Sequence, residues 1–387
     1  MTYDFDTVIS RRGTDSMKWD VGENELAMWV ADMDFPTAPE VREALQKRLD
    51  HGIFGYSDVP EAWYAAYMDW WKNRHGLAME KDWLIFCTGV IPAISSIINK
   101  LTTPNENVLI MTPVYNIFFN SIINHGCRVL ESELVYENGA YAVDFEDLEQ
   151  KLADPQTSMM ILCNPHNPVG KIWDRDILAR IGHLARKHSV IVISDEIHCD
   201  LTLPGRDYIP FASVNEECRD ISITCVAPTK AFNIAGLQTS AVIVPNPVLR
   251  HKVWRGLNND EVAEPNVFAC VAAVAAFTQG GAWLDALREY LAENRRISAA
   301  FIAEKLPMLH LIEAEATYLL WIDVSALGEN STKAAALLRE KTGLYVSAGG
   351  SYGKCGASFL RVNIACPRAL LLDGLSRLEV GIYDILG

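Results

Sequence analysis

Between residues 83 and 245, short runs of apolar and β-branched residues alternate with longer amphipathic segments. The short runs are WLIFCTG (83–89), NVLIMTPVY (107–115), SMMILCNP (158–165), VIVISDEIH (190–198), DISITCVAP (220–228) and TSAVIVP (239–245). Segments of helical length, such as 91–102, 116–126 and 175–188, separate several of them. Strands that alternate with helices in this way predict βαβ units and a mostly parallel sheet buried on both faces. We therefore expect an α/β fold.

The pattern changes near residue 285. Helical segments at 283–306 and 331–343 flank the strand-like run ATYLLWIDVS, and SFLRVNIA at 358–365 precedes a last helix. This order indicates an α+β unit, and the N-terminal residues contain no complete βαβ unit of their own. We expect a large α/β domain at 48–284 and a smaller α+β domain formed by 1–47 together with 285–387. Two domains also suit a chain of 387 residues, given ~150 residues per domain.

The net charge argues against two broad classes of partner. A formal charge of -15, with no block rich in lysine or arginine, opposes binding to nucleic acid and to anionic membranes.

The first residues lack the basic and then apolar pattern of a signal peptide, and no apolar run reaches ~18 residues. We therefore expect a cytoplasmic protein that binds a small molecule.

Metal binding and disulfide bonding are also not expected. The nine cysteines form no CxxC pair and lie mostly in apolar segments, which predicts buried free thiols. Asp32 and Asp34 in ADMDF resemble a carboxylate pair for a metal, but no histidine or cysteine set lies near them in the sequence. We expect both in a turn at the mouth of the active site.

Polar residues follow the predicted strands at the point where each strand ends. In α/β sheets, ligands bind beyond the carboxyl ends of the strands, so these residues belong together. They are Thr88-Gly89-Val90, Pro113-Val114-Tyr115, Asn164-Pro165-His166-Asn167-Pro168, Asp195-Glu196-Ile197-His198 and Ala227-Pro228-Thr229-Lys230. A lysine at such a place can act as a nucleophilic amine and form a Schiff base with a carbonyl. Taken alone, however, a loop lysine is more often an exposed surface residue.

The neighbours of Lys230 suggest what such an amine would meet. Asp195, at the end of a buried run, needs a cationic partner, which a protonated pyridine nitrogen would supply; the alternative is a helix cap. Asn167 lies between prolines and could donate to a phenolate oxygen, or it belongs to an ordinary turn. Tyr115 could stack on an aromatic ring or serve as a core tyrosine. Gly89 precedes a predicted helix whose free N–H groups would attract a phosphate.

Together these motifs resemble a known enzyme family. NPxNPxG, DExH and PTKxFN occur in order, with 28 residues from Asn167 to Asp195 and 35 from Asp195 to Lys230. This set resembles the fold-type I pyridoxal-phosphate enzymes of the class I/II aminotransferase group, and LRVNIACPR around Arg361 resembles their carboxylate-binding motif. Three stretches, MWVADMDF (28–35), FGYSDVP (54–60) and PTKAFNIAGLQ (228–238), are similar to the MalY/PatB branch, which comprises cystathionine β-lyases and related C-S lyases.

The resemblance implies a role for each residue of the site. It makes Lys230 the Schiff-base lysine and Asp195 the partner of the pyridinium, with Tyr115 stacked on the ring. It implies further contacts to the cofactor and substrate: Asn167 at the 3'-oxygen; Gly89, Val90 and Thr229 at the phosphate; Tyr56 at the phosphate of the neighbouring subunit; Arg361 at the substrate carboxylate; and Trp29, Val30 and Ala31 beside the substrate. His198 replaces a tyrosine near the 3'-oxygen, where an orienting role is as plausible as a catalytic one. Gln238 replaces an arginine that binds phosphate in many members.

The expected activity is a pyridoxal 5'-phosphate-dependent α,β-elimination on cystathionine or another S-substituted L-cysteine, which gives pyruvate, ammonia and a thiol. Two alternatives remain open from the sequence: an aminotransferase, because the same lysine can also move a proton to the cofactor, and a regulatory binding role like that of some relatives of MalY. A site shared through Tyr56 implies a homodimer.

Overall fold

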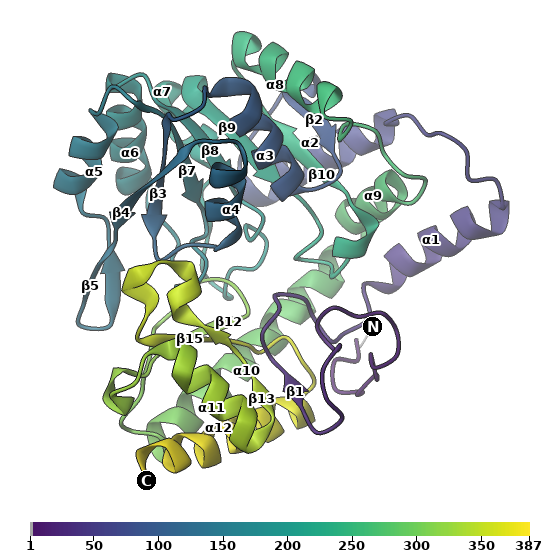
Figure 1. Ribbon diagram of the computed structural model, residues 1–387. Coiled ribbons are helices and arrows are strands. Elements are labelled where there is room, and N and C mark those ends of the chain that lie inside the picture. The colour runs from purple at the N-terminus through teal and green to yellow at the C-terminus, as the bar shows by residue number, and fades with distance from the viewer. Residues whose placement is uncertain (1–2) are drawn as a thin grey trace.

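A computed structural model describes residues 3–387 and contains a seven-stranded sheet as its largest element (Figure 1). The strand order is β2-β10-β9-β8-β7-β3-β4, and only β10 runs antiparallel to its neighbours. The strands are β2 (Leu84–Cys87), β3 (Asn107–Thr112), β4 (Arg128–Glu133), β7 (Thr157–Cys163), β8 (Ile191–Asp195), β9 (Ser222–Val226) and β10 (Ser240–Ile243). The predicted α/β fold with a mostly parallel sheet is confirmed.

Helices cover both faces of this sheet, which explains why its inner strands are buried at nearly every position. Along β3, Val108 and Ile110 belong to one core, and Leu109 and Met111 belong to another, because successive strand residues point to opposite faces. Three helices pack on the first core: α3 (Val90–Leu101), α4 (Ile117–Asn124) and α8 (Pro247–Asn259). Three more pack on the second: α5 (Phe145–Leu152), α6 (Arg175–Lys187) and α7 (Glu216–Ile221).

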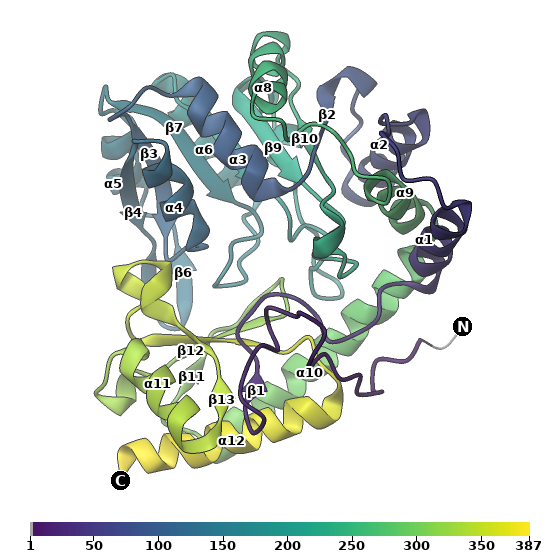
Figure 2. The same cartoon turned by 45° about the vertical axis from the view of Figure 1, so that its right-hand side comes forward.

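Three further helices lie beside the sheet, and a fourth runs from them down to the smaller sheet (Figure 2). The three are α1 (Pro39–His51), α2 (Glu61–His75) and α9 (Ala269–Gln279), and the fourth is α10 (Gly281–Lys305). Both α1 and α2 pack against α9. Each of these two ends at a glycine in the left-handed region, Gly52 at φ 73° and Gly76 at φ 67°, where a side chain would be strained. Within residues 3–387 no single helix is long and apolar enough to cross a membrane; α9 and α10 reach that length only as a pair bent by 77°.

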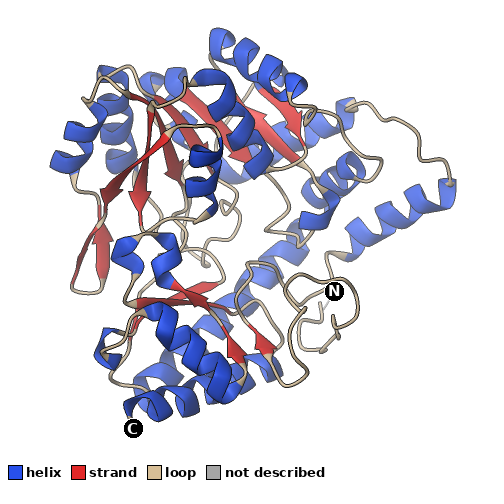
Figure 3. Ribbon diagram, in the orientation of Figure 1, coloured by secondary structure: helices blue, strands red, loops and turns tan. Residues whose placement is uncertain are grey.

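A second, four-stranded sheet lies below the first (Figures 1 and 3). Its order is β11-β12-β15-β14, and its strands are β11 (His310–Leu311), β12 (Leu319–Asp323), β14 (Ser347–Ala348) and β15 (Phe359–Asn363). The helices α11 (Ser331–Thr342) and α12 (Arg368–Leu386) accompany it. Two small pairs complete the fold: β1 (Leu26–Ala27) with β13 (Leu344–Tyr345), and β5 (Val135–Glu137) with β6 (Ala140–Ala142).

The pairing of β1 with β13 brings the N-terminal segment to the smaller sheet. The expected domain boundaries, after residue 47 and after residue 284, fall inside the continuous helices α1 and α10. The division into 48–284 and 1–47 plus 285–387 therefore stays a proposal. All nine cysteines are free, and all except Cys355 are buried.

Candidate active site

Asp195 is the last residue of β8, and Lys230 lies in the turn after the neighbouring strand β9; Asp195 is buried and Lys230 is partly buried. The Nζ of Lys230, in the turn after β9, donates to the carbonyl oxygen of Ala31 at 2.6 Å. Burial lowers the pKa of this amine to about 8, and the nearby Arg361 cation acts in the same direction. Asp195 ends β8 with 3% of its surface exposed. Burial raises the pKa of its carboxyl group to about 7, although the N–H of Ile197, which donates to Oδ1 at 3.1 Å, and Lys230 oppose the rise.

Arg361 connects three separate parts of the chain. It lies on β15 and is 5% exposed. One guanidinium nitrogen, Nη1, donates to Oδ1 of Asn167 at 3.2 Å, and Nη2 donates to the carbonyl oxygen of Trp29 at 3.0 Å. The guanidinium also lies over the ring of Tyr352, 4.7 Å from its centroid. The smaller sheet, the loop after β7 and the N-terminal segment thus meet at one side chain.

Tyr115 and His198 belong to the same electrostatic environment. The Tyr115 ring meets Phe118 edge-on, with centroids 5.6 Å apart. Burial raises the pKa of Tyr115 to about 12, which the Arg361 cation opposes. His198 is buried, and burial together with the Lys230 and Arg361 cations lowers its pKa to about 3. A neutral imidazole is therefore expected, and its Nδ1 has no hydrogen-bond partner among residues 3–387.

Gly89 caps the N-terminus of α3 without a side-chain hydrogen bond. The first N–H groups of this twelve-residue helix are thus free to meet an anion. Pro92 falls in the first turn, where its missing N–H costs nothing. A Cβ on Gly89 would lie 3.0 Å from Cδ of Pro92. Because glycine has no side chain, the N-terminus of the helix stays open to an anion. Val90 begins the helix, and Thr229 is buried. Gln238 is exposed and has φ 53°.

Tyr56 lies apart from these residues in the single chain. It belongs to the loop between α1 and α2, and its side chain is fully exposed, at 106% of the reference area. Ile53 and Phe54 in the same loop are exposed as well. The remaining predicted residues, Trp29, Val30 and Ala31, accept hydrogen bonds through their backbone carbonyl groups. Trp29 accepts from Arg361, Ala31 accepts from Lys230, and Val30 accepts from Nδ2 of Asn363.

Sequence reasoning missed the network that holds residues 28–35, here called the N-terminal strap. Asp34 is buried and accepts hydrogen bonds from Nζ of Lys18 at 2.8 Å, Nη1 of Arg11 at 2.9 Å and Nε1 of Trp19 at 2.8 Å. Arg11 also forms a two-point ion pair with Asp32, at 3.0 and 2.7 Å. Nothing in the local sequence around Arg11 or Lys18 indicates these partners.

Asn233 forms hydrogen bonds that connect the N-terminal strap to the loop that carries Lys230. Its Oδ1 accepts from the N–H of Met33 at 3.0 Å, and its Nδ2 donates to the carbonyl oxygens of Met33 at 3.0 Å and Phe35 at 2.8 Å. Asn233 is the last residue of the PTKxFN motif, so the motif itself was the available signal. Tyr318, on the smaller unit, donates its hydroxyl to the oxygen of Ala31 at 2.9 Å.

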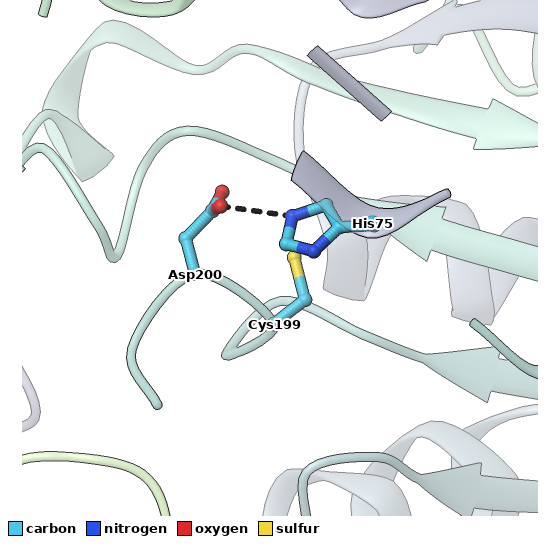
Figure 4. A group of neighbouring side chains, drawn as sticks. All are labelled: His75, Cys199 and Asp200. Atoms are coloured by element: carbon cyan, nitrogen blue, oxygen red, sulfur yellow. Dashed lines mark hydrogen bonds and ion pairs between the residues drawn. The ribbon is translucent and has the colours of Figure 1, made fainter. Parts of the chain in front are cut away.

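In a second cluster of polar side chains, His75, Cys199 and Asp200 approach one another (Figure 4). Nε2 of His75 lies 2.9 Å from Oδ1 of Asp200, and Nε1 of Trp70 donates to both oxygens of the same carboxylate at 3.0 and 3.2 Å. Three arginines also line the small cavity at this place: Arg74, Arg206 and Arg288. We interpret the cluster as a hydrogen-bonded carboxylate in cationic surroundings, and the expectation that the chain needs no metal stays a prediction.

Comparisons with known proteins identify the family of this chain. The family model for aminotransferase class I and II matches residues 16–378. Cystathionine beta-lyase PatB of Bacillus subtilis is 42% identical over 98% of this chain and 99% of that protein, and protein MalY of Escherichia coli is 34% identical over 97% and 98%. The PLP-bound C-S lyase from Staphylococcus hominis is 32% identical, with a TM-score of 0.93 over 99% of this chain and 98% of that one. The chain therefore belongs to the aminotransferase class I and II family, in the group that includes PatB and MalY.

Proposed function

We propose that this protein is a pyridoxal 5'-phosphate-dependent C-S β-lyase that cleaves cystathionine or a related S-substituted L-cysteine into pyruvate, ammonia and a thiol. The observation that carries the proposal is the partly buried Lys230 amine near the Asp195 carboxylate, with the Arg361 guanidinium in the same environment. The relatives named cystathionine beta-lyase and C-S lyase cover nearly the whole chain and support elimination over transamination.

The residues present fit this cofactor. Asp195 is buried, and among residues 3–387 its carboxylate accepts one hydrogen bond and forms no ion pair, so a protonated ring nitrogen would supply a cationic partner in direct contact. The uncapped N-terminus of α3 at Gly89 and Val90, with the Thr229 hydroxyl, suits a phosphate. Asn167 would hold the 3'-oxygen, with His198 nearby, and Tyr115 would lie against the ring. When bound, pyridoxal 5'-phosphate supplies a carbonyl for the lysine and a ring that withdraws electrons from the substrate Cα.

The side chains bind the substrate, transfer its proton and limit its access to water. Arg361 holds the substrate α-carboxylate through its planar fork. Lys230 would accept the proton from the substrate Cα, because its lowered pKa of about 8 makes the neutral amine accessible near neutral pH. Loss of this proton and of the thiolate from Cβ leaves aminoacrylate, which water hydrolyses to pyruvate and ammonia. Trp29, Val30 and Ala31 border the substrate from the strap and limit its access to water.

Two measurements test the assignment. Purified protein supplied with pyridoxal phosphate should release pyruvate from cystathionine or S-methylcysteine. Transfer of the amino group to a keto acid without pyruvate would instead identify an aminotransferase. Borohydride reduction followed by peptide mapping should then find the cofactor on the peptide that contains Lys230. A Lys171→Ala variant, which lacks a partly exposed lysine, should be labelled to the same extent, and labelling at another lysine would refute the site.

We further propose that the protein acts as a homodimer in which each chain lends Tyr56 to its neighbour's phosphate site. The support is the full exposure of this tyrosine on a loop that also exposes Ile53 and Phe54. Large apolar side chains grouped on one loop are typical of interaction surfaces.

A further inference from the structure

The carbonyl oxygen of Ala31, in the N-terminal strap, accepts two hydrogen bonds from side chains that come from different parts of the fold. Nζ of Lys230 donates to it at 2.6 Å, and the hydroxyl of Tyr318 donates to it at 2.9 Å. A carbonyl oxygen has two lone pairs, so these two donors complete its hydrogen bonding. The amine that the proposed reaction uses as a base thus shares its acceptor with a tyrosine hydroxyl.

Tyr318 is fully buried and directly precedes β12. The imidazole of His198 meets its ring edge-on, with centroids 6.3 Å apart. Its backbone carbonyl oxygen accepts from the N–H of Ile364 at 2.9 Å, and β12 pairs with β15, the strand that carries Arg361. The side chain therefore connects the smaller sheet, the loop after β8 and the N-terminal strap.

Thr317, the residue before Tyr318, has a backbone conformation that a β-branched residue rarely adopts. Its φ of 71° lies in the left-handed region, where such a residue is strained. Three contacts hold it there: its N–H donates to the carbonyl oxygen of Leu201 at 2.7 Å, its carbonyl oxygen accepts from Nη2 of Arg295 at 3.2 Å, and its Oγ1 accepts from the N–H of Leu319 at 3.3 Å. Strain persists only where the surrounding structure fixes it, and it clusters at functional sites. Thr317 thus indicates a function for the tyrosine that follows it.

The groups that surround the Lys230 amine have opposing effects on its pKa. Burial and the Arg361 cation lower this pKa to about 8, whereas the carboxylates of Asp32 and Asp195 raise it. His198 adds no charge, because burial lowers its pKa to about 3. A hydrogen bond that favours either the amine or the ammonium form of Lys230 therefore changes the fraction of neutral amine near neutral pH.

We propose that Tyr318 is a positioning residue for the base: by sharing the Ala31 carbonyl, its hydroxyl fixes where the Lys230 amine rests and favours the neutral amine over the ammonium. Burial raises the pKa of Tyr318, so the hydroxyl keeps its proton and remains a donor. The positive end of its O–H dipole points at the oxygen that a Lys230 ammonium would also use, and it therefore weakens that bond for the charged form. The inference rests on the proposed function, in which Lys230 is the base.

Changes to the Tyr318 hydroxyl test this effect in both directions. Trace acetylation of the full-length, cofactor-free protein over a range of pH, followed by mass spectrometry of the peptide that contains residue 230, measures the pKa of Lys230. Tyr318→Phe should raise this pKa by about half a unit to one unit, as expected for the loss of one hydrogen bond. Site-specific replacement of Tyr318 by 3-fluorotyrosine, whose hydroxyl is a stronger donor, should lower it.

Tyr383→Phe is the matched control, because this hydroxyl also donates to a backbone carbonyl, that of Lys305 at 2.8 Å, from a half-exposed position on α12. It should leave the pKa of Lys230 unchanged. An unchanged pKa in Tyr318→Phe, or shifts of the same sign in the two Tyr318 variants, would overturn the proposal, because packing alone would then explain the tyrosine. If Tyr318→Phe does not fold, an unchanged pKa in the 3-fluorotyrosine protein overturns it in the same way.

The cofactor-loaded enzyme gives a second measurement. Because the base must be neutral, the acid limb of the pH profile of kcat for pyruvate release should move to higher pH in Tyr318→Phe and stay in place in Tyr383→Phe. An acid limb that does not move in Tyr318→Phe would count against the proposal. A wild-type protein that releases no pyruvate would refute the proposed function, whereas the acetylation experiment would still decide the role of Tyr318.

Discussion

At Asp195, burial opposes the charged form of the carboxyl group, and this makes the stability of the cofactor-free protein depend on pH. Its pKa rises from 3.8 to about 7 on folding, so the folded state binds a proton that the unfolded state has released. The contribution of this proton to the free energy of unfolding is complete below about pH 4 and is lost as the pH rises through about 7. The free energy of unfolding falls over this range by up to roughly 1.4 kcal/mol per pH unit. Asp195→Asn should flatten this decline.

Urea unfolding of the cofactor-free protein at several pH values checks this expectation. Glu196, whose pKa burial also raises to about 7, contributes equally to both proteins, so the difference between them isolates Asp195. Asp176→Asn, at an exposed position on α6, is the matched control and should follow the wild-type curve. Parallel curves for wild type and Asp195→Asn would contradict the proposed burial effect.

Arg361 provides a second prediction at the scale of one residue. Arg361→Lys keeps the charge but loses the fork that would hold the substrate carboxylate. The loss of one or two charged hydrogen bonds corresponds to about a 10- to 100-fold fall in kcat/KM, mostly through a higher KM. Steady-state kinetics measure this, with Arg377→Lys, on the surface of α12, as the control. An unchanged KM would argue against Arg361 as the carboxylate site.

Among the structural elements, the N-terminal strap depends on Asn233 for its position. Asn233→Gly removes three hydrogen bonds to the strap but tolerates the φ of 54°. We expect a loss of about 1–3 kcal/mol in the free energy of unfolding. We also expect lower kcat/KM, because the carbonyl groups of Trp29 and Ala31, which bond to Arg361 and Lys230, would shift.

A matched glycine variant separates backbone from side-chain effects at this strap. Asn138 has φ 52° and lies in the hairpin of β5 and β6, remote in sequence from the strap. Asn138→Gly should leave stability and kinetics close to wild type. If Asn233→Gly behaves in the same way under chemical denaturation and steady-state assay, the side chain does not position the strap.

The polar residues at the ends of the strands could be predicted from the sequence, whereas the contacts between distant segments could not. Asp195 and Lys230 each follow a buried apolar run, and parallel strands bring their carboxyl ends to one edge. The antiparallel direction of β10 was not predicted, because an apolar run has the same pattern in either direction. The edge strand β4 was missed because only Ser132 of its six residues is buried. The hydrogen-bond partners of Asp34 are Arg11, Lys18 and Trp19. They are distant from it in the sequence, and only the folded chain brings them together.

At the scale of the whole molecule, the proposed site requires both sheets. Lys230 and Asn167 come from loops of the large sheet, and Arg361 comes from β15 of the small one. The hydrogen bonds from Arg361 to Asn167 and from Lys230 to Ala31 connect these units directly. A fragment that contained the large sheet alone would lack Arg361, the residue proposed to bind the substrate carboxylate.

The last prediction concerns the neighbour that Tyr56 would serve. If each site combines Lys230 of one chain with Tyr56 of the other, Lys230→Ala and Tyr56→Ala homodimers are both impaired. Mixed dimers of a two-fold symmetric enzyme then contain one intact site, so an equal mixture after subunit exchange should recover about a quarter of wild-type activity. Lys230→Ala mixed with Asp195→Asn should recover none, because those two residues belong to one chain's site. Failure of the first mixture to exceed the second, with exchange verified by mass, would refute the shared site.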